Sequence, residues 1–359
     1  MSRRSTRNRA LTLGAAILTA LALVPVACVP TPTVPPTTSV PPSGAARALD
    51  RAVDWILDQF NSQGYMPVAG DPTSPDLGAG VIAVATLASL GKGAETARQR
   101  LDELESNFET YVDEGAGDRP GALARVILAV VAAGGDPRDF GGNDLVSRLE
   151  ATQQPDGLFG LQYAGFDGAF RQGLALSALS LVNPPPTTIT PGPGQTINDV
   201  PAVAWLLNQQ CGDGSWLMFR ASTAGRCIEV PSMQIYKDSN GSALAALGLA
   251  AVDATPRNDP AAWFTSVRGL DGGWGASPSG PTQVSDSNST GLVIAALEAL
   301  DEAPDSTAYD TLLSFQIERP DPDEGAFMWR PSSRGVIRMS TLDAVVALYD
   351  RVWPAALLP

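Results

Sequence analysis

Three short polar stretches stand directly before apolar segments, and they hold the side chains best suited to chemistry. They are Phe166-Asp167-Gly168, Tyr236-Lys237-Asp238-Ser239-Asn240 and Asp286-Ser287-Asn288-Ser289. A carboxylate in such a place can act as a general acid or hold a ligand, whereas the amide of Asn288 has no acidic proton to give. The alternative for each aspartate is a helix N-cap, in which the carboxylate accepts a backbone N–H of the first turn.

The composition narrows the chemistry that is available. The chain has no histidine, which excludes Ser-His-Asp and Cys-His nucleophile pairs, a histidine general base and any histidine-ligated metal. Its three cysteines are too few for a cysteine-rich metal site, so we expect no metal and no resident cofactor. The net charge of −14 disfavours nucleic acid as a partner, because phosphate binding needs a basic surface.

The N-terminus has the pattern of an export signal. Four arginines precede an apolar stretch at 10–24, which is short for a membrane span, and Ala27 suits cleavage. We therefore expect residues 1–27 to be a signal peptide and the protein to be exported, either extracellular or at the cell surface. Cys28 is then either the lipid-modified first residue of a lipoprotein or a thiol lost with the signal. It is the one membrane attachment that we expect.

Residues 28–43 are rich in Pro and Thr, which predicts an extended polyproline stalk, with a disordered tail as the alternative. The rest of the chain, 44–359, has the pattern of a folded domain that contains a Pro-rich surface loop at 183–198. In an exported chain, Cys211 and Cys227 are expected to form a disulfide. This bond would staple an excursion at 211–235, within which 217–230 is the segment with a strand-like hairpin pattern.

Two kinds of helical segment alternate along the domain. Amphipathic segments lie near 45–60, 95–112, 143–153, 199–210, 260–268 and 307–316. Segments that are apolar on nearly all sides lie at 81–90, 123–133, 174–182, 243–252, 292–300 and 342–349. Because the second kind must be buried all round, six such hairpins predict a closed ring of two concentric helix layers. An open solenoid is the alternative.

A motif between the two kinds of segment resembles the QW motif of the terpenoid cyclase and protein prenyltransferase superfamily. It is complete at Trp205, Gln209, Gly214 and Trp216, and recurs with changes at Gln153, Gly157 and Phe159, at Gly272 and Trp274, and at Gln316, Gly325 and Phe327. The resemblance implies an all-α fold, the (α/α)6 toroid. The glycine would take a backbone turn that a β-carbon would strain, and the aromatic residue would fill the space between the layers.

Within this superfamily, the site residues must decide the function. Prenyltransferase subunits hold zinc with Asp, Cys and His, so the lack of histidine excludes that function. Squalene–hopene-type cyclases protonate their substrate from an Asp-x-Asp-Asp run, and the central acid of that run is here Asn288. The balance therefore favours a binder without chemistry. The alternatives are a cyclase-like enzyme that uses another acid, such as Asp167 or Asp238, and a structural cell-surface module with a filled centre.

The chain is also similar to the α-domain of intrinsic factor and transcobalamin, which carry corrinoids. The expected partner is thus a hydrophobic or amphipathic small molecule, with a corrinoid among the candidates, or a cell-surface protein, and we expect a monomer. Arg125, Arg171 and Arg338 interrupt apolar segments, so each should face a carboxylate or the cavity. The residues predicted to rim the cavity are Asp167, Arg171, Tyr236, Asp238, Asn240, Asp286, Asn288, Trp329 and Arg338.

Overall fold

The computed structural model describes residues 44–90, 93–113, 115, 117–160, 167–219, 226–233, 235–278, 282–349 and 351–357. All of them belong to one compact unit, residues 38–359. The predicted signal peptide, the predicted stalk and Cys28 lie outside the described residues.

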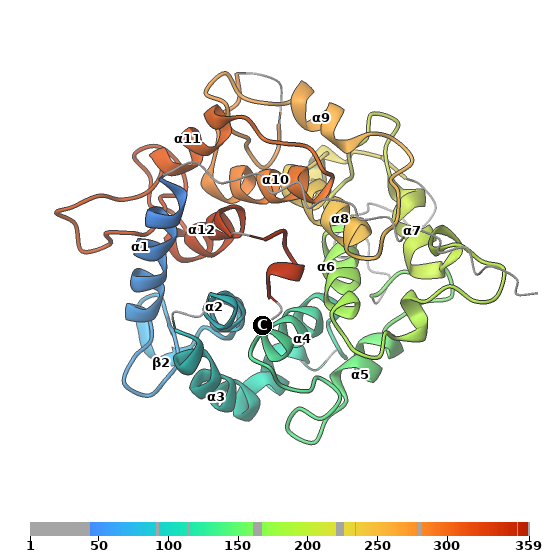
Figure 1. The fold of residues 1–359 in the computed structure, drawn as a ribbon, viewed down its shortest axis with the longest axis horizontal. Coiled ribbons are helices and arrows are strands. Elements are labelled where there is room, and N and C mark those ends of the chain that lie inside the picture. Colours follow the sequence, from blue (N-terminus) through green and yellow to red (C-terminus); the bar gives the residue numbers. More distant parts are fainter. Residues whose placement is uncertain are drawn as a thin grey trace, which may run out of the picture. The chain divides into compact units, whose positions relative to one another are not determined.

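Twelve α-helices form this unit within the described residues. Six make an outer layer: α1 (Ala45–Asp58), α3 (Ala94–Val112), α5 (Leu145–Ala151), α7 (Pro201–Gln209), α9 (Pro260–Ser266) and α11 (Ser306–Ser314). Six alternate with them as an inner layer: α2 (Leu77–Ser89), α4 (Pro120–Ala132), α6 (Ala169–Ser180), α8 (Ser239–Ala251), α10 (Ser287–Ala299) and α12 (Ile337–Ala344). The predicted all-α (α/α)6 toroid is confirmed, as Figure 1 shows.

The inner helices close a ring. Each packs against the next in chain order, and α12, which continues as the 3-10 turn η4 (Val345–Leu348), returns to α2. The open-solenoid alternative is therefore wrong. The physical reason is the one expected: inner-helix side chains such as Val81, Ile127 and Leu176 have no exposed surface, so each inner helix needs neighbours on every side.

The motif glycines make the turn between the layers. Gly157, Gly214, Gly272 and Gly325 have φ angles of 98°, 96°, 93° and 92°, in the left-handed region that favours glycine. Each turn also lies against a neighbouring outer helix, at its start for Gly157, Gly214 and Gly272 and at Arg51 of α1 for Gly325. At Gly214, for example, a β-carbon would lie 2.2 Å from the carbonyl oxygen of Asp259, which precedes α9. Both conformation and space therefore require glycine.

The motif aromatic residue joins the two layers, as predicted. Trp216 is fully buried, and its indole N–H donates to the Leu206 carbonyl of α7 at 2.9 Å. Its backbone N–H donates to Ser242 Oγ of α8, also at 2.9 Å. Trp274 makes the equivalent bonds to α9 and α10 in the next hairpin, at 2.8 and 3.1 Å.

The glutamine of the complete motif is Gln210 rather than Gln209. The Nε2 of Gln210 donates to the carbonyls of Gly214 (3.0 Å) and Asn258 (2.8 Å), and its Oε1 accepts the Asn258 N–H (2.9 Å). Two adjacent glutamines made the alignment ambiguous by one residue. When Gln210 is taken as the motif glutamine, Gly214 follows it by four residues. Gly157 follows Gln153 and Gly272 follows Arg268 by the same number.

The last copy of the motif joins the end of the ring to its beginning. Gln316 donates to the carbonyl of Gly325 at 2.9 Å and to that of Ala48, in α1, at 2.7 Å. A β-carbon at Gly325 would lie 2.3 Å from the Arg51 carbonyl oxygen. The same contact that links neighbouring hairpins thus links the sixth hairpin to the first.

Strand structure is sparse among the described residues. A short antiparallel hairpin, β1 (Pro67–Val68) and β2 (Asp71–Pro75), precedes α2. The described part of 217–230 forms isolated bridges, Leu217 with Lys237 and Val230 with Ile235. These bridges are consistent with the predicted β-like excursion, of which 220–225 lie outside the described residues, and the described part packs on the inner helices. A β-carbon at Gly241 of α8 would lie 2.7 Å from the Cα of Met218.

The predicted disulfide between Cys211 and Cys227 is confirmed, with 5.5 Å between the Cα atoms. A disulfide suggests an oxidising environment. Across the described ranges, every helix is too short or too polar to cross a lipid bilayer. The Pro-rich loop at 183–198 contributes the short turn η1 (Thr187–Ile189) and part of η2 (Ile197–Asp199).

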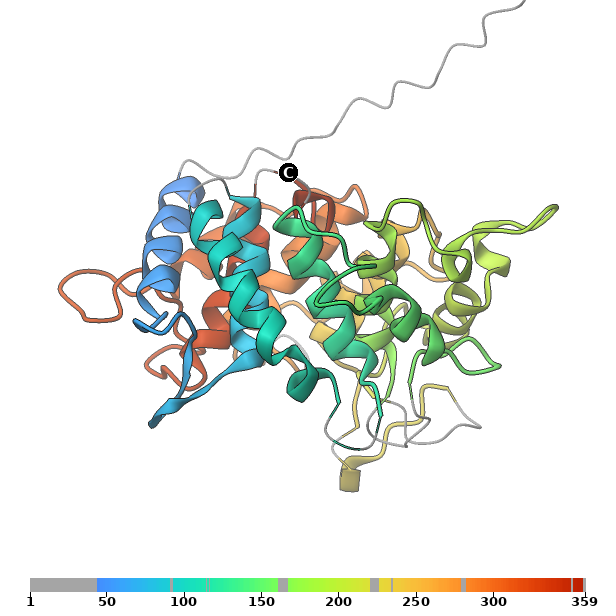
Figure 2. The ribbon, with the colours of Figure 1, turned by 90° about the horizontal axis from the view of Figure 1, so that it is seen from below.

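The two faces of the ring differ, as Figure 2 shows. All inner helices begin on one face, which we call the mouth face, where the β1–β2 hairpin and η3 (Pro231–Met233) project. The C-terminal segment lies on the opposite face, where η5 (Ala355–Leu357) contacts α2 and α4. Trp353 and Leu357 of this segment are buried over the end of the central space.

Candidate functional site

A cavity of about 100 Å³ lies at the centre of the ring. Every inner helix contributes an apolar side chain to its wall, and Trp353 and Leu357 line it from the C-terminal segment. The apolar residues from α2, α4, α6, α8, α10 and α12 include Ile82, Leu128, Leu174, Leu244, Leu292 and Leu342. A few polar side chains interrupt this wall, among them Arg125, Asn240 and Asp343. An apolar space with few polar groups is typical of small-molecule sites.

Asp343 of α12 is the acid of this cavity. Burial raises the pKa of its carboxyl, although the Asn288 amide and the charge of Arg125 act in the opposite direction. Asn288 Nδ2 donates to the carboxyl at 2.9 Å, and Asn288 Oδ1 accepts from Ser340 Oγ at 3.0 Å. The two bonds fix which way the Asn288 amide points. Asn288 is therefore not itself part of the cavity wall, but it holds in place the Asp343 carboxyl that is.

Sequence reasoning missed Asp343, although a signal was present. The residue lies in the apolar segment 342–349, where a charged side chain is as unexpected as Arg125 is in its own segment. Applying the argument used for the arginines to this aspartate would have found it. Its partnership with Asn288, 55 residues away, has no sequence signal.

Asn240, one of the residues predicted from the sequence, lines the cavity from α8. Its Oδ1 atom is buried and has no hydrogen-bond partner among the described residues. Buried polar atoms in proteins nearly always have a partner, and an orphaned one needs an explanation. Asn240 thus brings an acceptor without a partner close to the cavity, where a hydroxyl group of a bound molecule could satisfy it.

Asp238 and Asp286 are helix N-caps. Asp238 accepts the Gly241 N–H at 2.7 Å, and Asp286 accepts the Ser289 N–H at 2.8 Å. Burial raises the pKa of Asp238 to about 7, and burial likewise raises the pKa of Asp286. Because each carboxylate is turned to the first turn of its own helix, neither is among the residues that line the central cavity. We therefore assign them a structural role.

The arginines that interrupt apolar segments do face carboxylates or cavities. Arg171 pairs with Asp167 at 3.4 Å, and Arg338 pairs with Asp76 at 3.1 Å. Arg125 lines the central cavity, where its charge acts on Asp343. Arg338 also donates to the carbonyl of Pro67 at 2.7 Å, which places it at the β1–β2 hairpin rather than at the cavity.

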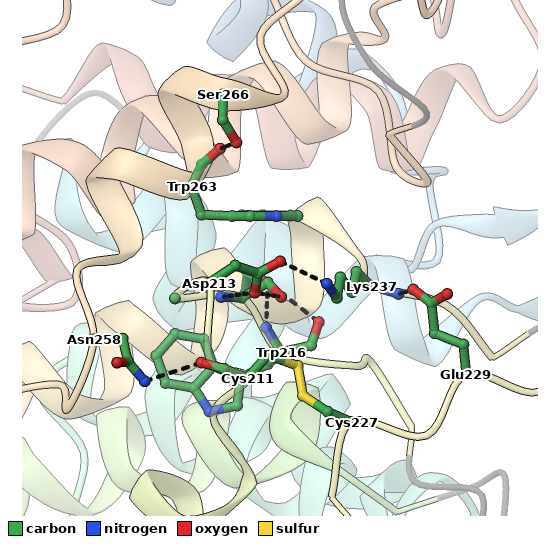
Figure 3. A network of polar contacts seen from close by, with 12 residues as sticks. Cys211, Asp213, Trp216, Cys227, Glu229, Lys237, Asn258, Trp263 and Ser266 are labelled. Atoms are coloured by element: carbon green, nitrogen blue, oxygen red, sulfur yellow. Dashed lines mark hydrogen bonds and ion pairs between the residues drawn. A yellow bond between two sulfur atoms is a disulfide. The ribbon is translucent and has the colours of Figure 1, made fainter.

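Tyr236 lies in a different place from the other predicted residues. With Lys237, Asp213 and Trp263 it lines an outer groove of about 500 Å³. Figure 3 shows Trp263 above Asp213, whose carboxylate pairs with Lys237 Nζ at 2.5 Å. Burial opposes ionisation of Asp213, but the hydrogen bonds from Lys237 and Ser215 lower its pKa overall. The groove lies beside the disulfide, outside the layer of inner helices.

Trp329, the remaining predicted residue, is not part of the cavity wall either. The guanidinium of Arg330 lies 4.0 Å from the centre of its ring, and its carbonyl accepts the Ser287 N–H at 3.1 Å. It therefore supports the start of α10. In the ranges that the structure describes, no three His, Cys, Asp or Glu side chains are grouped to hold a metal ion.

No protein-family model matches this chain, and no curated protein matches its sequence. Solved structures are similar in fold. A protein from Actinoplanes is 16% identical, with 85% of this chain and 99% of that one covered and a TM-score of 0.52. A type II terpene cyclase from Scytonema, in complex with geranylgeranyl dihydroxybenzoate, is 13% identical, with 85% and 96% covered and a TM-score of 0.55. A glycosidase in complex with glucose is 13% identical, with 88% and 98% covered and a TM-score of 0.51. At these identities the likeness shows that the chain has an α/α-toroid fold of the kind found in terpene cyclases and glycosidases.

Proposed function

We propose that this protein is an exported receptor that encloses one small, largely apolar molecule at the centre of the toroid. The observation that carries the proposal is a largely apolar cavity beside which Asn240 holds a buried Oδ1 that has no hydrogen-bond partner among the described residues. A ligand with an apolar body and one hydroxyl or similar donor would satisfy that atom and fill the space. The predicted signal peptide and the disulfide support the exported location.

The size of the space limits the ligand. The cavity of about 100 Å³ is of the same order as an engineered cavity of about 150 Å³ that admits benzene. A whole corrinoid is much larger, so the proposal is narrowed to smaller amphiphiles. A structural module with a filled centre would have no such apolar space, and this disfavours the third alternative.

Binding of decanol tests the proposal. We expect the purified full chain to bind N-phenyl-1-naphthylamine at one site, from which decanol displaces it. At 100 times the dissociation constant, decanol should stabilise the protein by about 2.7 kcal/mol. Leu292→Trp fills the cavity and should weaken binding at least tenfold. Leu270→Trp, which makes the same change at a residue that is 84% exposed, is the control. Equal binding by the two variants, or no saturable binding by the unaltered protein, would refute the proposal.

Asp343 supports a second candidate function, acid-catalysed cyclisation of an alkene. Burial raises the pKa of this carboxyl, and in its protonated form it can transfer its proton to a carbon–carbon double bond, which leaves a carboxylate and a substrate cation. Ring closure and loss of a proton from the cation would then restore the acid. In this reading Asp343, rather than Asp167 or Asp238, is the acid that replaces the one missing at Asn288.

Turnover of farnesol distinguishes the two functions. Under the second function, the unaltered protein yields a cyclic product that gas chromatography with mass spectrometry detects. Asp343→Asn should then lower turnover roughly 100- to 10,000-fold with farnesol binding retained. Asp238→Asn is the control, because that buried acid caps α8 and does not line the cavity. Binding of farnesol without any product would exclude the second function and would leave the receptor function as the proposal.

A further inference from the structure

A second space lies next to the central cavity and opens at the mouth face. We call it the vestibule; its volume is about 260 Å³. Three residues, Arg125, Phe170 and Leu174, line both the vestibule and the central cavity, so the two spaces adjoin. A molecule with its apolar body in the central cavity would therefore place its other end in the vestibule.

Three arginines gather in the vestibule: Arg119, Arg125 and Arg171. Burial lowers the pKa of Arg171; Asp167 acts in the opposite direction, and the charges of Arg119 and Arg125 lower it further. Three guanidinium groups together in a partly buried place favour an anion beside them, and Asp167, which pairs with Arg171, is one such anion. The grouping is the more notable because the chain as a whole has a net charge of −14.

Aromatic rings hold each guanidinium group in place. Arg119 lies 5.5 Å from the ring centre of Tyr111, Arg125 lies 5.8 Å from that of Phe170, and Arg171 lies 5.6 Å from that of Phe219. A guanidinium group stacked on a ring keeps its N–H groups at the edge, where they can donate to a planar or tetrahedral anion. The arrangement is thus prepared for an anion before one binds.

The vestibule also lies where α4 and α6 begin. Neither helix start has a side-chain cap, whereas α8 and α10 are capped by Asp238 and Asp286. The positive end of a helix dipole favours an anion nearby. These two helix starts therefore add to the field of the three arginines and do not oppose it.

We infer that the vestibule binds the anionic head group, a carboxylate or a phosphate monoester, of the amphiphile whose apolar body fills the central cavity. The inference rests on the proposed receptor function and adds to it the class of ligand. The arginines select the acid, and the leucines and isoleucine of the inner helices hold the chain. Asn240 then accepts from a donor group on that chain.

Three ligands with the same ten-carbon chain test the inference: decanol, decanoic acid and decyl phosphate. We expect the full chain to bind both anions at least ten times more tightly than decanol, with the preference falling as sodium chloride is raised. The anion that binds more tightly identifies the head group. Arg125→Gln and Arg119→Gln should each reduce the preference at least tenfold. Arg119 lies outside the wall of the central cavity, so decanol should bind to Arg119→Gln as before, which also reports that this variant is folded. Arg98→Gln removes the same charge from the exposed face of α3 and should leave the preference unchanged.

The outcomes separate this inference from the proposed function. If decanol binds and the anions bind no more tightly, the vestibule is not an anion site although the receptor function stands. If the preference survives in both Arg125→Gln and Arg119→Gln, the arginines do not provide it and the inference is wrong. If none of the three ligands binds, both the proposed receptor function and this inference are wrong.

Discussion

Raising the pH from 4 to 7 is expected to destabilise this protein, and Asp238→Asn is expected to remove much of that loss. Burial raises the pKa of Asp238 to about 7, above the value of about 3.9 for an unfolded chain. Between these values the folded state binds more protons than the unfolded state, so the free energy of unfolding falls as the pH rises. The difference of about three pH units corresponds to at most about 4 kcal/mol from this one group. Burial also raises the pKa of Asp286 and of Asp343, which adds to the same trend.

Urea unfolding at pH 4 to 8 measures this effect. Asparagine keeps the side-chain oxygen that accepts the Gly241 N–H, so Asp238→Asn retains the cap and loses the buried charge. We expect the variant to be more stable than the unaltered protein at pH 8 and similar to it near pH 4. The control is Asp259→Asn, an exposed cap that accepts the Ala261 N–H of α9. Parallel pH profiles for Asp238→Asn and the unaltered protein would show that Asp238 titrates as it does in an unfolded chain.

Gly214→Ala is expected to destabilise the ring by about 2–5 kcal/mol. The left-handed backbone at φ 96° costs an alanine about 1–2 kcal/mol. The new β-carbon would also lie 2.2 Å from the Asp259 carbonyl oxygen, and relieving such overpacking costs about 1–3 kcal/mol more. The contact is with backbone, so no side chain can rotate away to relieve it. Urea unfolding at fixed pH gives the change in free energy.

Gly212→Ala is the matched control for that measurement. It lies two residues away in the same turn region, and a β-carbon there would meet no atom within 4 Å. We expect its effect to stay within about 0.5 kcal/mol, as for most surface substitutions. Similar losses at the two positions would mean that the region tolerates alanine poorly for a reason other than the contact with Asp259.

The toroid itself was predictable because its determinants are local. Glycine at 157, 214, 272 and 325 indicates a left-handed backbone conformation. Trp216 indicates a space between the two helix layers that a large side chain fills. The alternation of one-sided and all-round apolar segments indicated which helices lie inside. The pairing of Cys211 with Cys227 followed from their number, once residues 1–28 had been set aside.

The candidate site was predictable only in part, for a physical reason. An inner helix such as α8 is apolar on every side, so its sequence does not show which side faces the cavity. Asp238, Ser239 and Asn240 stand together in the chain, yet Asn240 alone lines the central cavity. Asp238 was assigned to the rim by the same reasoning, and it caps the helix instead.

Contacts between residues of different hairpins could not be predicted from the sequence either. Asn288 and Asp343 meet because α10 packs on α12, and Phe219 reaches Arg171 because the excursion folds over the start of α6. Both depend on how separate hairpins are arranged around the ring.

The contact of Gln316 and Gly325 with α1 has a consequence for the order in which the chain folds. During synthesis α1 is made early, but its partners Gln316 and Gly325 follow more than 260 residues later. Until they emerge from the ribosome, one edge of the growing ring stays uncovered, and its apolar surface is open to other proteins. Completion of the structure is therefore a late, long-range event, of the kind that slows folding. An incomplete ring is what a chaperone would meet, and the closed toroid forms only after Gln316 and Gly325 have left the ribosome.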